Sequence, residues 1–498
     1  GASSGMAMAH WEIQGWMILI LGWVFVPFYS RSMVYTMPEF LERRYNPQSR
    51  TILSVISLVS YVLTKVAVTV YAGGLVFQQV FGIKELWGID FFWIAAIGLV
   101  VLTAIYTIFG GMKSVLYTSV LQTPILLLGS LIILVLGFKE LGGWDEMMRV
   151  CGAVTVNDYG DTMTNLIRSN DDANFPWLGA LIGSAIIGFW YWCTDQFIVQ
   201  RVLSGKNEKE ARRGTIFGAY LKLLPVFLFL IPGMIAFALH QKYIGAGGEG
   251  FLPMLANGTA NADAAFPTLV AKLLPAGVKG LVVCGILAAL MSSLASLFNS
   301  SAMLFTIDFY KRFRPETPEK KLVGIGQVAT VVIVILGILW IPIMRSVGDV
   351  LYTYLQDVQS VLAPGIAAAF LLGVCWKRTS AQGGMWGLIS GMVIGLTRLG
   401  AKVYYSNAGE VADSTFKYLF YDMNWLFFCG WMFLFCMIVV IVVSLTTKAP
   451  TAEKIQGLVF GTATKEQKAA TRVSWDHWDI IHTVIILSIT AAFYWYFW

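Results

Sequence analysis

The sequence of 498 residues is 57% hydrophobic and only 13% charged, with a formal net charge of +6. Soluble domains carry about 25% charged residues, so this composition excludes an ordinary soluble protein and predicts a polytopic α-helical membrane protein. The apolar segments are long runs, unlike the short alternating strands of a transmembrane β-barrel, and the excess of Lys and Arg is typical of cytoplasmic loops rather than of a nucleic-acid-binding surface.

Twelve apolar stretches are long enough to cross the roughly 30 Å hydrocarbon core of a bilayer as helices. These predicted spans cover residues 11–32, 51–80, 89–109, 113–137, 177–199, 214–240, 278–310, 322–344, 349–375, 383–400, 425–446 and 479–498. Because no loop is long enough for a separate soluble domain, residues 1–498 are predicted to form a single transmembrane domain.

The charge of the loops predicts the orientation of the spans. Loops that follow the odd-numbered spans contain about twice as many Lys and Arg residues as the opposite loops, and basic loops stay in the cytoplasm. Both ends of the chain are therefore expected on the outer side. The chain begins GASSGMAMAH without an initiator Met, which predicts that it starts inside a longer protein.

Ionisable residues inside a span are costly unless they face protein or water, so each is a candidate functional residue. The alternative is a structural ion pair or a side chain that snorkels to the interface. Both interpretations stay open for most of them, whereas the basic segment after Asp308 favours a structural role there. Lys222, well inside an apolar span, is the strongest functional candidate. The in-span ionisable residues are Glu12, Lys65, Asp195, Lys222, Asp308 and Asp357.

The stretch 287–301 gathers Ser, Ala and Asn residues on one apolar helix. Small residues allow close packing of helices, which is one interpretation. The other is a sodium site, because Na⁺ prefers oxygen ligands, and the adjacent hydroxyls of Ser292 and Ser293 with a backbone carbonyl suit it.

Two further spans contain polar and aromatic residues at membrane depth. The segment GFWYWCTDQFIVQR at 188–201 predicts a broken helix that lines a cavity, with an interfacial aromatic belt as the alternative. The segment 352–365 contains Gln356, Gln359 and Pro364, a set that predicts a water-filled cavity. Amides, a Lys, a Glu and aromatic faces together suit a neutral polyol.

The motifs of the common enzyme classes are missing from the sequence. It has no HExxH, P-loop or GxSxG motif and only four His residues, so a transporter is favoured over an enzyme. Its six Cys residues show no CxxC spacing, which argues against a zinc site or a disulfide framework.

Several long segments resemble the sodium:solute symporter family, in particular its sodium/glucose (galactose) cotransporter branch. They follow the order found in that family and cover nearly the whole chain. The segments are YTMPEFLERRYN (35–46), YTIFGGMKSVLYTSVLQT (106–123), WYWCTDQFIVQRVL (190–203), AYLKLLPVFLFLIPGMIAFAL (219–239), ALMSSLASLFNSSAMLFTIDFYKRF (289–313) and LAPGIAAAFLLGVCWKR (362–378).

The resemblance implies an all-α, LeuT-type fold, in which two inverted repeats of five helices alternate access to a central site. It also implies that about twelve transmembrane helices are visible here and that N-terminal helices are missing. The first family helix and the broken helix after it are expected upstream of Gly1. Part of the sodium site and part of the sugar site are therefore expected outside this chain.

The family's substrate-binding positions match residues of four predicted spans. Glu12, Lys222 and Gln356 match residues that contact the sugar. Tyr191 matches the residue that stacks under the sugar as the inner gate, and Trp192 lies beside it. The resemblance therefore implies a sugar held by hydrogen bonds and by aromatic faces.

The family's outer gate and sodium site are also matched. Trp11 and Tyr352 fall at the aromatic positions of the outer gate. The implied metal ligands are the backbone carbonyl of Ala289 and the hydroxyls of Ser292 and Ser293.

Two positions depart from the family pattern. Ser119 in YTSVLQT stands where members with a second sodium site have Asp, and the missing carboxylate predicts one Na⁺ per sugar. Gly188 stands where some members place Asn or Ser near the hydroxyls of the ring, so one sugar contact is expected to be lost.

These features predict Na⁺-coupled uptake of a glucose- or galactose-like hexose by alternating access. The partners are the sugar, Na⁺ and the lipid bilayer, with no nucleic acid and no oligomeric state assigned. The alternatives are a symporter of myo-inositol, a sialic acid, a monocarboxylate or an amino acid, and a transporter-derived sensor or channel. An acid carrier is disfavoured because no Arg lies mid-span among the candidate residues. Compact loops without targeting signals predict a multi-pass protein of the cell membrane, interpreted as a bacterial inner membrane.

Overall fold

A computed structural model describes residues 1–32, 34, 36–255, 258–347, 351–407 and 413–498 of the chain. Within these ranges the side chains of residues 106, 108–116, 118, 121, 343–347, 352–353 and 407 are not described.

The regular structure of the described chain is helical apart from one short hairpin and two isolated β-bridges. In the first half the elements are η1 (Gly5–Met8), α1 (Ala9–Glu12), α2 (Gly15–Ile20), η2 (Leu21–Phe25), α3 (Val26–Ser32), α4 (Met37–Arg44), α5 (Pro47–Ser60), η3 (Tyr61–Val66), α6 (Ala67–Phe81), β1 (Glu85–Leu86), β2 (Ile89–Asp90), α7 (Phe91–Leu141), α8 (Trp144–Gly152), α9 (Trp177–Gly188), η4 (Phe189–Thr194), α10 (Gln196–Leu203), α11 (Glu208–Pro225), η5 (Val226–Leu230) and α12 (Ile231–Gly245). The two strands pair antiparallel.

The second half continues with helices alone. These are η6 (Ala262–Ala264), α13 (Ala265–Leu273), α14 (Ala276–Met303), η7 (Leu304–Tyr310), α15 (Lys311–Phe313), α16 (Glu319–Val347), α17 (Leu351–Cys375), α18 (Ala381–Asn407), α19 (Thr415–Lys417), η8 (Tyr418–Asp422), α20 (Trp425–Thr446), η9 (Ala452–Lys454), α21 (Lys465–Val473) and α22 (His477–Tyr496).

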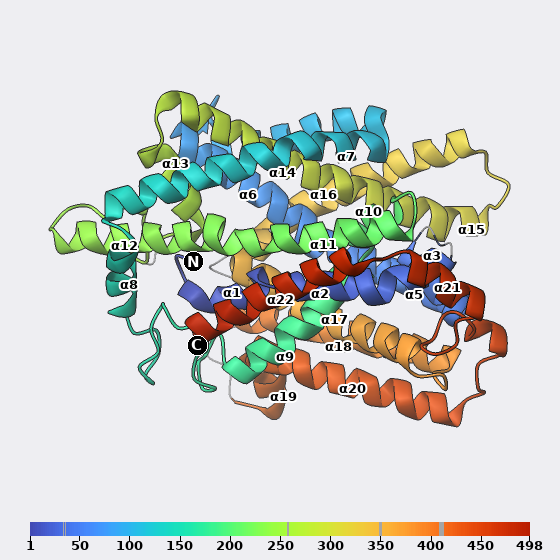
Figure 1. Ribbon diagram of the computed structural model, residues 1–498. Helices are drawn as coiled ribbons and strands as arrows, with labels where there is room; N and C mark the ends of the chain where they lie inside the picture. Colours follow the sequence, from blue (N-terminus) through green and yellow to red (C-terminus); the bar gives the residue numbers. More distant parts are fainter. Residues whose placement is uncertain (33, 35, 256–257, 348–350, 408–412) are drawn as a thin grey trace.

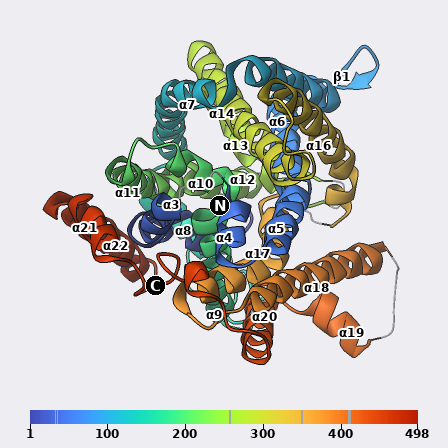
Figure 2. The ribbon, with the colours of Figure 1, turned by 90° about the vertical axis from the view of Figure 1, so that its right-hand side faces the viewer.

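Each predicted span lies mostly in helical structure among the described residues, except that residues 89–90 form β2 and residues 349–350 lie outside the described part. Among the described residues, ten helices are long and apolar enough to cross a membrane. One predicted boundary is wrong, because the spans 89–109 and 113–137 both belong to α7, a continuous helix of 51 residues, with no loop at 110–112. A straight helix of that length would extend about 77 Å, more than twice the hydrocarbon core. Figure 2 shows α7 following an arc along one edge of the bundle.

Local sequence sets the ends of several spans. Asn46 caps α5 by accepting a hydrogen bond from the backbone N–H of Ser49, and Pro47 supplies the first helical residue. Gly82 ends α6 in the left-handed conformation, with φ of 66°, which glycine adopts without a Cβ penalty. Asp90 then caps α7.

The predicted broken helix over 188–201 is confirmed. The π-helical segment η4 ends at Thr194, and Asp195 adopts an extended conformation before α10 begins. The first span is also interrupted, at Ile13 and Gln14 between α1 and α2. Breaks of this kind are tolerated at membrane depth only where they face protein or a wet cavity.

The long helices lie side by side, with their connections at two opposite ends of the bundle (Figure 1). The α10–α11, α15–α16 and α20–α21 connections lie at one end, and α8 and the α12–α13 connection lie at the other. The first group contains the most basic loops, so by the positive-inside rule this end is expected to face the cytoplasm. The assignment of sides from loop charge stays a prediction.

Two hydrophobic clusters form the core. One joins the N-terminal helices to α9–α12 and α22. The other joins η3, α6 and the start of α7 to α14 and α16. Helix α17 contributes residues to both clusters, and its span is the most deeply buried of the ten, at 89%. It therefore connects the two packed bodies.

Candidate functional site

A central cavity of about 210 Å³ brings together residues from four separate regions of the chain. They come from α1, the α9–η4 segment, α11 and α17. Six of the predicted site residues line this cavity: Trp11, Glu12, Tyr191, Trp192, Lys222 and Gln356. The remaining lining residues are Gln14, Ile187, Gly188, Leu355 and Gln359.

Glu12 and Lys222 form an ion pair at the wall of the cavity. The Lys222 Nζ and Glu12 Oε2 atoms are 2.8 Å apart, and both side chains are only partly exposed. The ammonium also lies 5.7 Å from the centre of the Trp192 ring, a distance at which a cation is attracted to an aromatic face. The pair is neutral overall, so the cavity holds strong hydrogen-bonding groups without net charge.

Helix α17 adds two amides to the same cavity. Gln356 and Gln359 are 7% and 4% exposed. The Oε1 atom of Gln356 is buried and has no hydrogen-bond partner among the described residues. Because an unpaired buried acceptor costs about 1–3 kcal/mol, this oxygen is suited to accept a hydrogen bond from a bound hydroxyl.

Gln14 occupies the space left by Gly188. A Cβ atom at Gly188 would lie 2.7 Å from Gln14 Oε1, so a larger residue would displace that amide. Gln14 donates to the carbonyl of Ser184 at 2.9 Å and accepts from the indole of Trp192 at 3.4 Å. Gln14 is not among the site residues predicted from the sequence, although an amide two residues after Glu12 in an apolar span is a usable signal.

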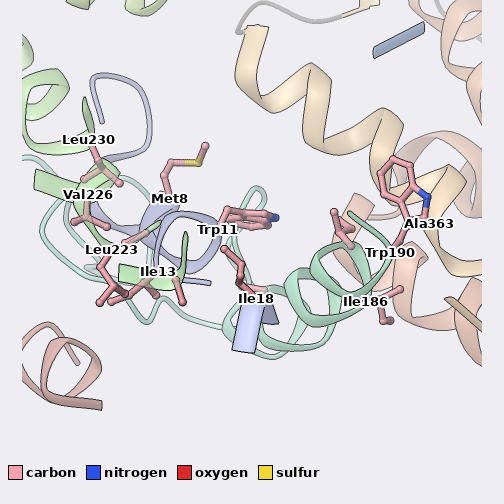
Figure 3. Close-up of a cluster of buried hydrophobic side chains, with 14 of the residues drawn as sticks. Met8, Trp11, Ile13, Ile18, Ile186, Trp190, Leu223, Val226, Leu230 and Ala363 are labelled. Carbon is pink, nitrogen blue, oxygen red and sulfur yellow. The ribbon is translucent and has the colours of Figure 1, made fainter. Parts of the chain in front are cut away.

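Trp11 closes one side of the cavity within an aromatic cluster. Its ring stacks on Trp425 at 5.4 Å and meets Phe175 edge-on at 5.7 Å. Figure 3 shows Trp11 between the N-terminal segment that carries Met8 and the helix that carries Ile186. Phe175 precedes α9 and Trp425 begins α20, both at the end opposite the basic loops, which agrees with an outer position. The side chain of Tyr352, the second residue assigned to the outer gate, lies outside the described part of the structure.

Tyr191 lies over a buried ion pair on the opposite side. Lys65 Nζ bonds the carboxylate of Asp195 and lies 4.8 Å from the centre of the Tyr191 ring. Tyr61 donates a second hydrogen bond to Asp195, at 2.8 Å. Asp195 also caps α10 by accepting from the N–H of Phe197. The structural interpretation of Lys65 and Asp195 therefore holds, and their pairing joins η3 to the break in the helix that carries Tyr191.

The other two in-span acids are also paired. Asp308 bonds Arg50, with 2.6 Å between Arg50 Nη2 and Asp308 Oδ1, and accepts from the hydroxyl of Thr36. Asp357 bonds Lys402 of α18. The structural interpretation favoured for Asp308 is confirmed, and the same interpretation describes Asp357.

The serine-rich helix α14 divides into two parts. Ser296 and Ser300 accept hydrogen bonds from Arg201 and Gln200 of α10, so these serines serve helix packing. Ser292 is buried, and its hydroxyl lies 2.6 Å from that of Ser119 on α7. Ser293, the adjacent residue predicted to bind sodium, is exposed.

The candidate metal ligands of α14 are hydroxyl and backbone carbonyl oxygens. The described residues contain no group of three or more His, Cys, Asp or Glu side chains that could hold a metal ion. Carbonyls and hydroxyls like those of Ala289, Ser292 and Ser293 suit a hard monovalent cation and not a tightly held transition metal.

Comparison with protein families gives one match over most of the chain. The model of the "Sodium:solute symporter family" matches residues 1–391. Three similar proteins are animal cotransporters. Human sodium/myo-inositol cotransporter 2 is 35% identical over 93% of this chain and 69% of its own length. Human sodium/glucose cotransporter 4 is 37% identical over 93% of this chain and 69% of its own length. The sodium/mannose cotransporter SLC5A10 of Bos taurus is 35% identical over 97% of this chain and 83% of its own length.

Comparison with solved structures supports the fold. The chain superposes on a Na⁺-coupled sialic acid symporter with a TM-score of 0.67 and 21% sequence identity, over 90% of this chain and 85% of the other. The LeuT-type arrangement expected from the sequence is therefore confirmed. The animal origin of the similar cotransporters gives no support to the bacterial inner membrane inferred from the loops.

Proposed function

Because this chain belongs to the sodium:solute symporter family, we propose that the solute it carries with Na⁺ is a neutral hexose of the glucose or galactose type. The single observation that carries this proposal is the central cavity. It gathers an internally neutralised ion pair, three buried amides and three aromatic side chains around a volume of about 210 Å³. This set suits a small ring with several hydroxyl groups.

The charge of the cavity argues against an acidic solute. Its described lining contains one cation, Lys222, and that cation is already paired with Glu12. A carboxylate brought into the cavity would have to compete with Glu12 for the ammonium, because no Arg lines the site. A neutral polyol can instead donate to Glu12 and Gln356 without leaving a buried charge unpaired.

The proposed site residues divide between binding and gating. Glu12, Lys222 and Gln356 would hydrogen-bond the hydroxyls, and Trp192 would offer its face to the C–H side of the ring. Tyr191 would form the inner gate and Trp11 the outer gate. Alternating access requires that sodium and sugar stabilise the same conformations, since a ligand shifts an equilibrium only through differential affinity.

Sodium is proposed to bind at α14, through the carbonyl of Ala289 and the hydroxyls of Ser292 and Ser293. Sodium binding from the outer side would favour the conformation in which the central cavity is open outward. The hydroxyl contact between Ser292 and Ser119 supports one site and not two, because the position that could supply a second carboxylate holds only a hydroxyl.

Myo-inositol is the second candidate solute. The similarity to human sodium/myo-inositol cotransporter 2, at 35% identity, matches the similarity to the sugar cotransporters. Myo-inositol is also a neutral six-membered ring of hydroxyls, so the argument from charge applies to it equally.

The decisive test is uptake by the full-length protein in proteoliposomes. Radiolabelled glucose, galactose, mannose, myo-inositol and sialic acid are compared under an inward Na⁺ gradient and under a matched K⁺ gradient. We expect Na⁺-dependent accumulation of glucose or galactose above the other solutes. Preferential accumulation of myo-inositol would select the second candidate, and accumulation of sialic acid alone would contradict the neutral cavity.

A further inference from the structure

A second cavity lies away from the central site, on the outside of the bundle. It is a groove of about 800 Å³ between α5–η3, η7 and α16. Its walls are almost entirely apolar and include Leu58, Val62, Phe305, Val328 and Leu336. Val328 is 65% exposed and Leu336 is 47% exposed, so the groove opens to the membrane. No candidate sugar or sodium residue lines it.

Local backbone features widen the groove. Two of its walls are π-helical, η3 and η7, and π-helical turns are wider than α-helical turns and often mark functional sites. In the third wall Gly324 lacks a side chain, and a Cβ atom there would meet no other atom within 4 Å. A side chain at position 324 would therefore extend into open space at the wall of the groove.

One end of the groove carries unpaired positive charge. Lys321 and Tyr310 line this end. The exposed residues Lys311, Arg314 and Lys320 are close to them in sequence. These four basic residues, Lys311, Arg314, Lys320 and Lys321, have no ion-pair partner among the described residues. This end belongs to the α15–α16 connection, which lies with the other basic loops on the cytoplasmic side (Figure 1).

The groove is longer than the depth of one leaflet. From Lys321 to Leu336, α16 rises about 22 Å at 1.5 Å per residue. The hydrocarbon core is about 30 Å thick, so the groove reaches past the depth of one leaflet from its cytoplasmic edge. An acyl chain lying along α16 could therefore be covered over its whole length.

We propose that this groove binds one anionic glycerophospholipid of the cytoplasmic leaflet. An acyl chain lies against the apolar walls, and the phosphate sits at Lys321 with the hydroxyl of Tyr310 beside it. The charge of the rim selects an anionic headgroup, because a zwitterionic headgroup would bring its own ammonium close to the unpaired lysines. Anionic lipids are concentrated in the cytoplasmic leaflet, and each nearby Lys or Arg strengthens their binding.

The test is native mass spectrometry of the purified full chain, titrated with phosphatidylglycerol or with phosphatidylcholine of the same acyl chains. We expect phosphatidylglycerol to bind about five-fold more tightly, the factor that one juxtamembrane lysine supplies. Lys321→Glu removes this preference and leaves phosphatidylcholine binding unchanged. Gly324→Leu fills the groove and lowers the binding of both lipids.

Matched controls separate these effects from general charge and folding. Lys206→Glu reverses the charge of an exposed lysine in the α10–α11 connection on the same side, and Gly98→Leu adds a side chain at another helical glycine that has open space. Both should bind phosphatidylglycerol like the wild type. Equal binding of the two lipids by the wild type would overturn the anionic headgroup. Wild-type binding by Gly324→Leu, or competition by glycerol 3-phosphate alone, would overturn the groove.

Discussion

Gln356 offers the most specific polar contact in the central cavity, because its amide oxygen is buried and has no partner among the described residues. We expect Gln356→Ala to weaken apparent sugar affinity about 10- to 100-fold, the range for a lost hydrogen bond to a buried group. The measurement is the half-saturating sugar concentration in Na⁺-driven uptake. Gln241→Ala, at an exposed glutamine of α12, is the control. Unchanged affinity in Gln356→Ala would remove this residue from the proposed site.

Ser119 and the serines of α14 set the expected sodium stoichiometry. We expect a Hill coefficient for Na⁺ near one and one charge moved per sugar, since Ser119 contributes a hydroxyl where a second site needs a carboxylate. Ser119→Asp, next to Ser292, should raise the Hill coefficient toward two, whereas Ser119→Ala should leave it near one. Ser293→Ala should raise the half-saturating Na⁺ concentration about ten-fold.

Reversal potentials measured at different sugar gradients check this stoichiometry independently. A coupling ratio of two in the wild type would contradict the argument from Ser119. Wild-type Na⁺ dependence in Ser293→Ala would place the sodium site elsewhere.

At the scale of elements, the Lys65–Asp195 pair joins η3 to the break between η4 and α10. Asp195→Asn keeps the cap on α10, because Asn is also a good cap, but leaves a buried ammonium without its counterion. We expect this variant to lose about 3–5 kcal/mol of stability. Thermal unfolding of the purified protein measures the loss. The pair Lys65→Met with Asp195→Asn should recover most of it, and equal instability of the double variant would exclude charge imbalance as the cause.

Asp263 links the outer loop to the start of α17. Both of its carboxylate oxygens accept hydrogen bonds from the backbone N–H of Leu351, at 3.2 and 3.0 Å. Burial raises the pKa of Asp263 to about 6, from an ordinary value of 3.8. Because the folded-state pKa lies above the unfolded one, the folded protein takes up a proton as the pH falls from about 6 to about 4. Its stability therefore increases over that interval.

Asp263→Asn should imitate the protonated form at every pH, because its amide oxygen can still accept from Leu351. We expect the variant to melt about 2 °C above the wild type at pH 7.5, with the difference gone at pH 4. Melting curves across this range give the measurement. A difference between the two melting temperatures that widens as the pH falls from 7.5 to 4 would reverse the sign and contradict the burial argument.

For the whole molecule, the bundle predicts which loops face the cytoplasm. Cys284 and Cys375 are the two exposed cysteines and are first replaced by Ser. We expect Lys206→Cys to be labelled by an impermeant maleimide only from the cytoplasmic side, and Glu249→Cys only from the outer side, because their loops lie at opposite ends of the bundle. Labelling of both positions from one side would contradict the orientation derived from loop charge.

The sequence alone determined the membrane class and most of the helical ranges, and it predicts the side of each loop. These properties depend on the hydropathy and charge of consecutive residues, which is why the helical segments and the break near Asp195 were predictable. The boundary predicted at residues 110–112 was wrong. Two adjacent glycines, Gly110 and Gly111, are typical of a turn, but here α7 continues through them.

Only the tertiary structure decided how these groups are partnered. Glu12 and Lys222, or Lys65 and Asp195, are separated by more than a hundred residues, and no local pattern states that they pair. Gln14 became part of the cavity because Gly188 on another helix leaves it room, and Gln356 became an available acceptor because its neighbours leave it unpaired. Pairing, burial and free space depend on contacts between distant segments, so they follow from the packed bundle and not from any single stretch of the chain.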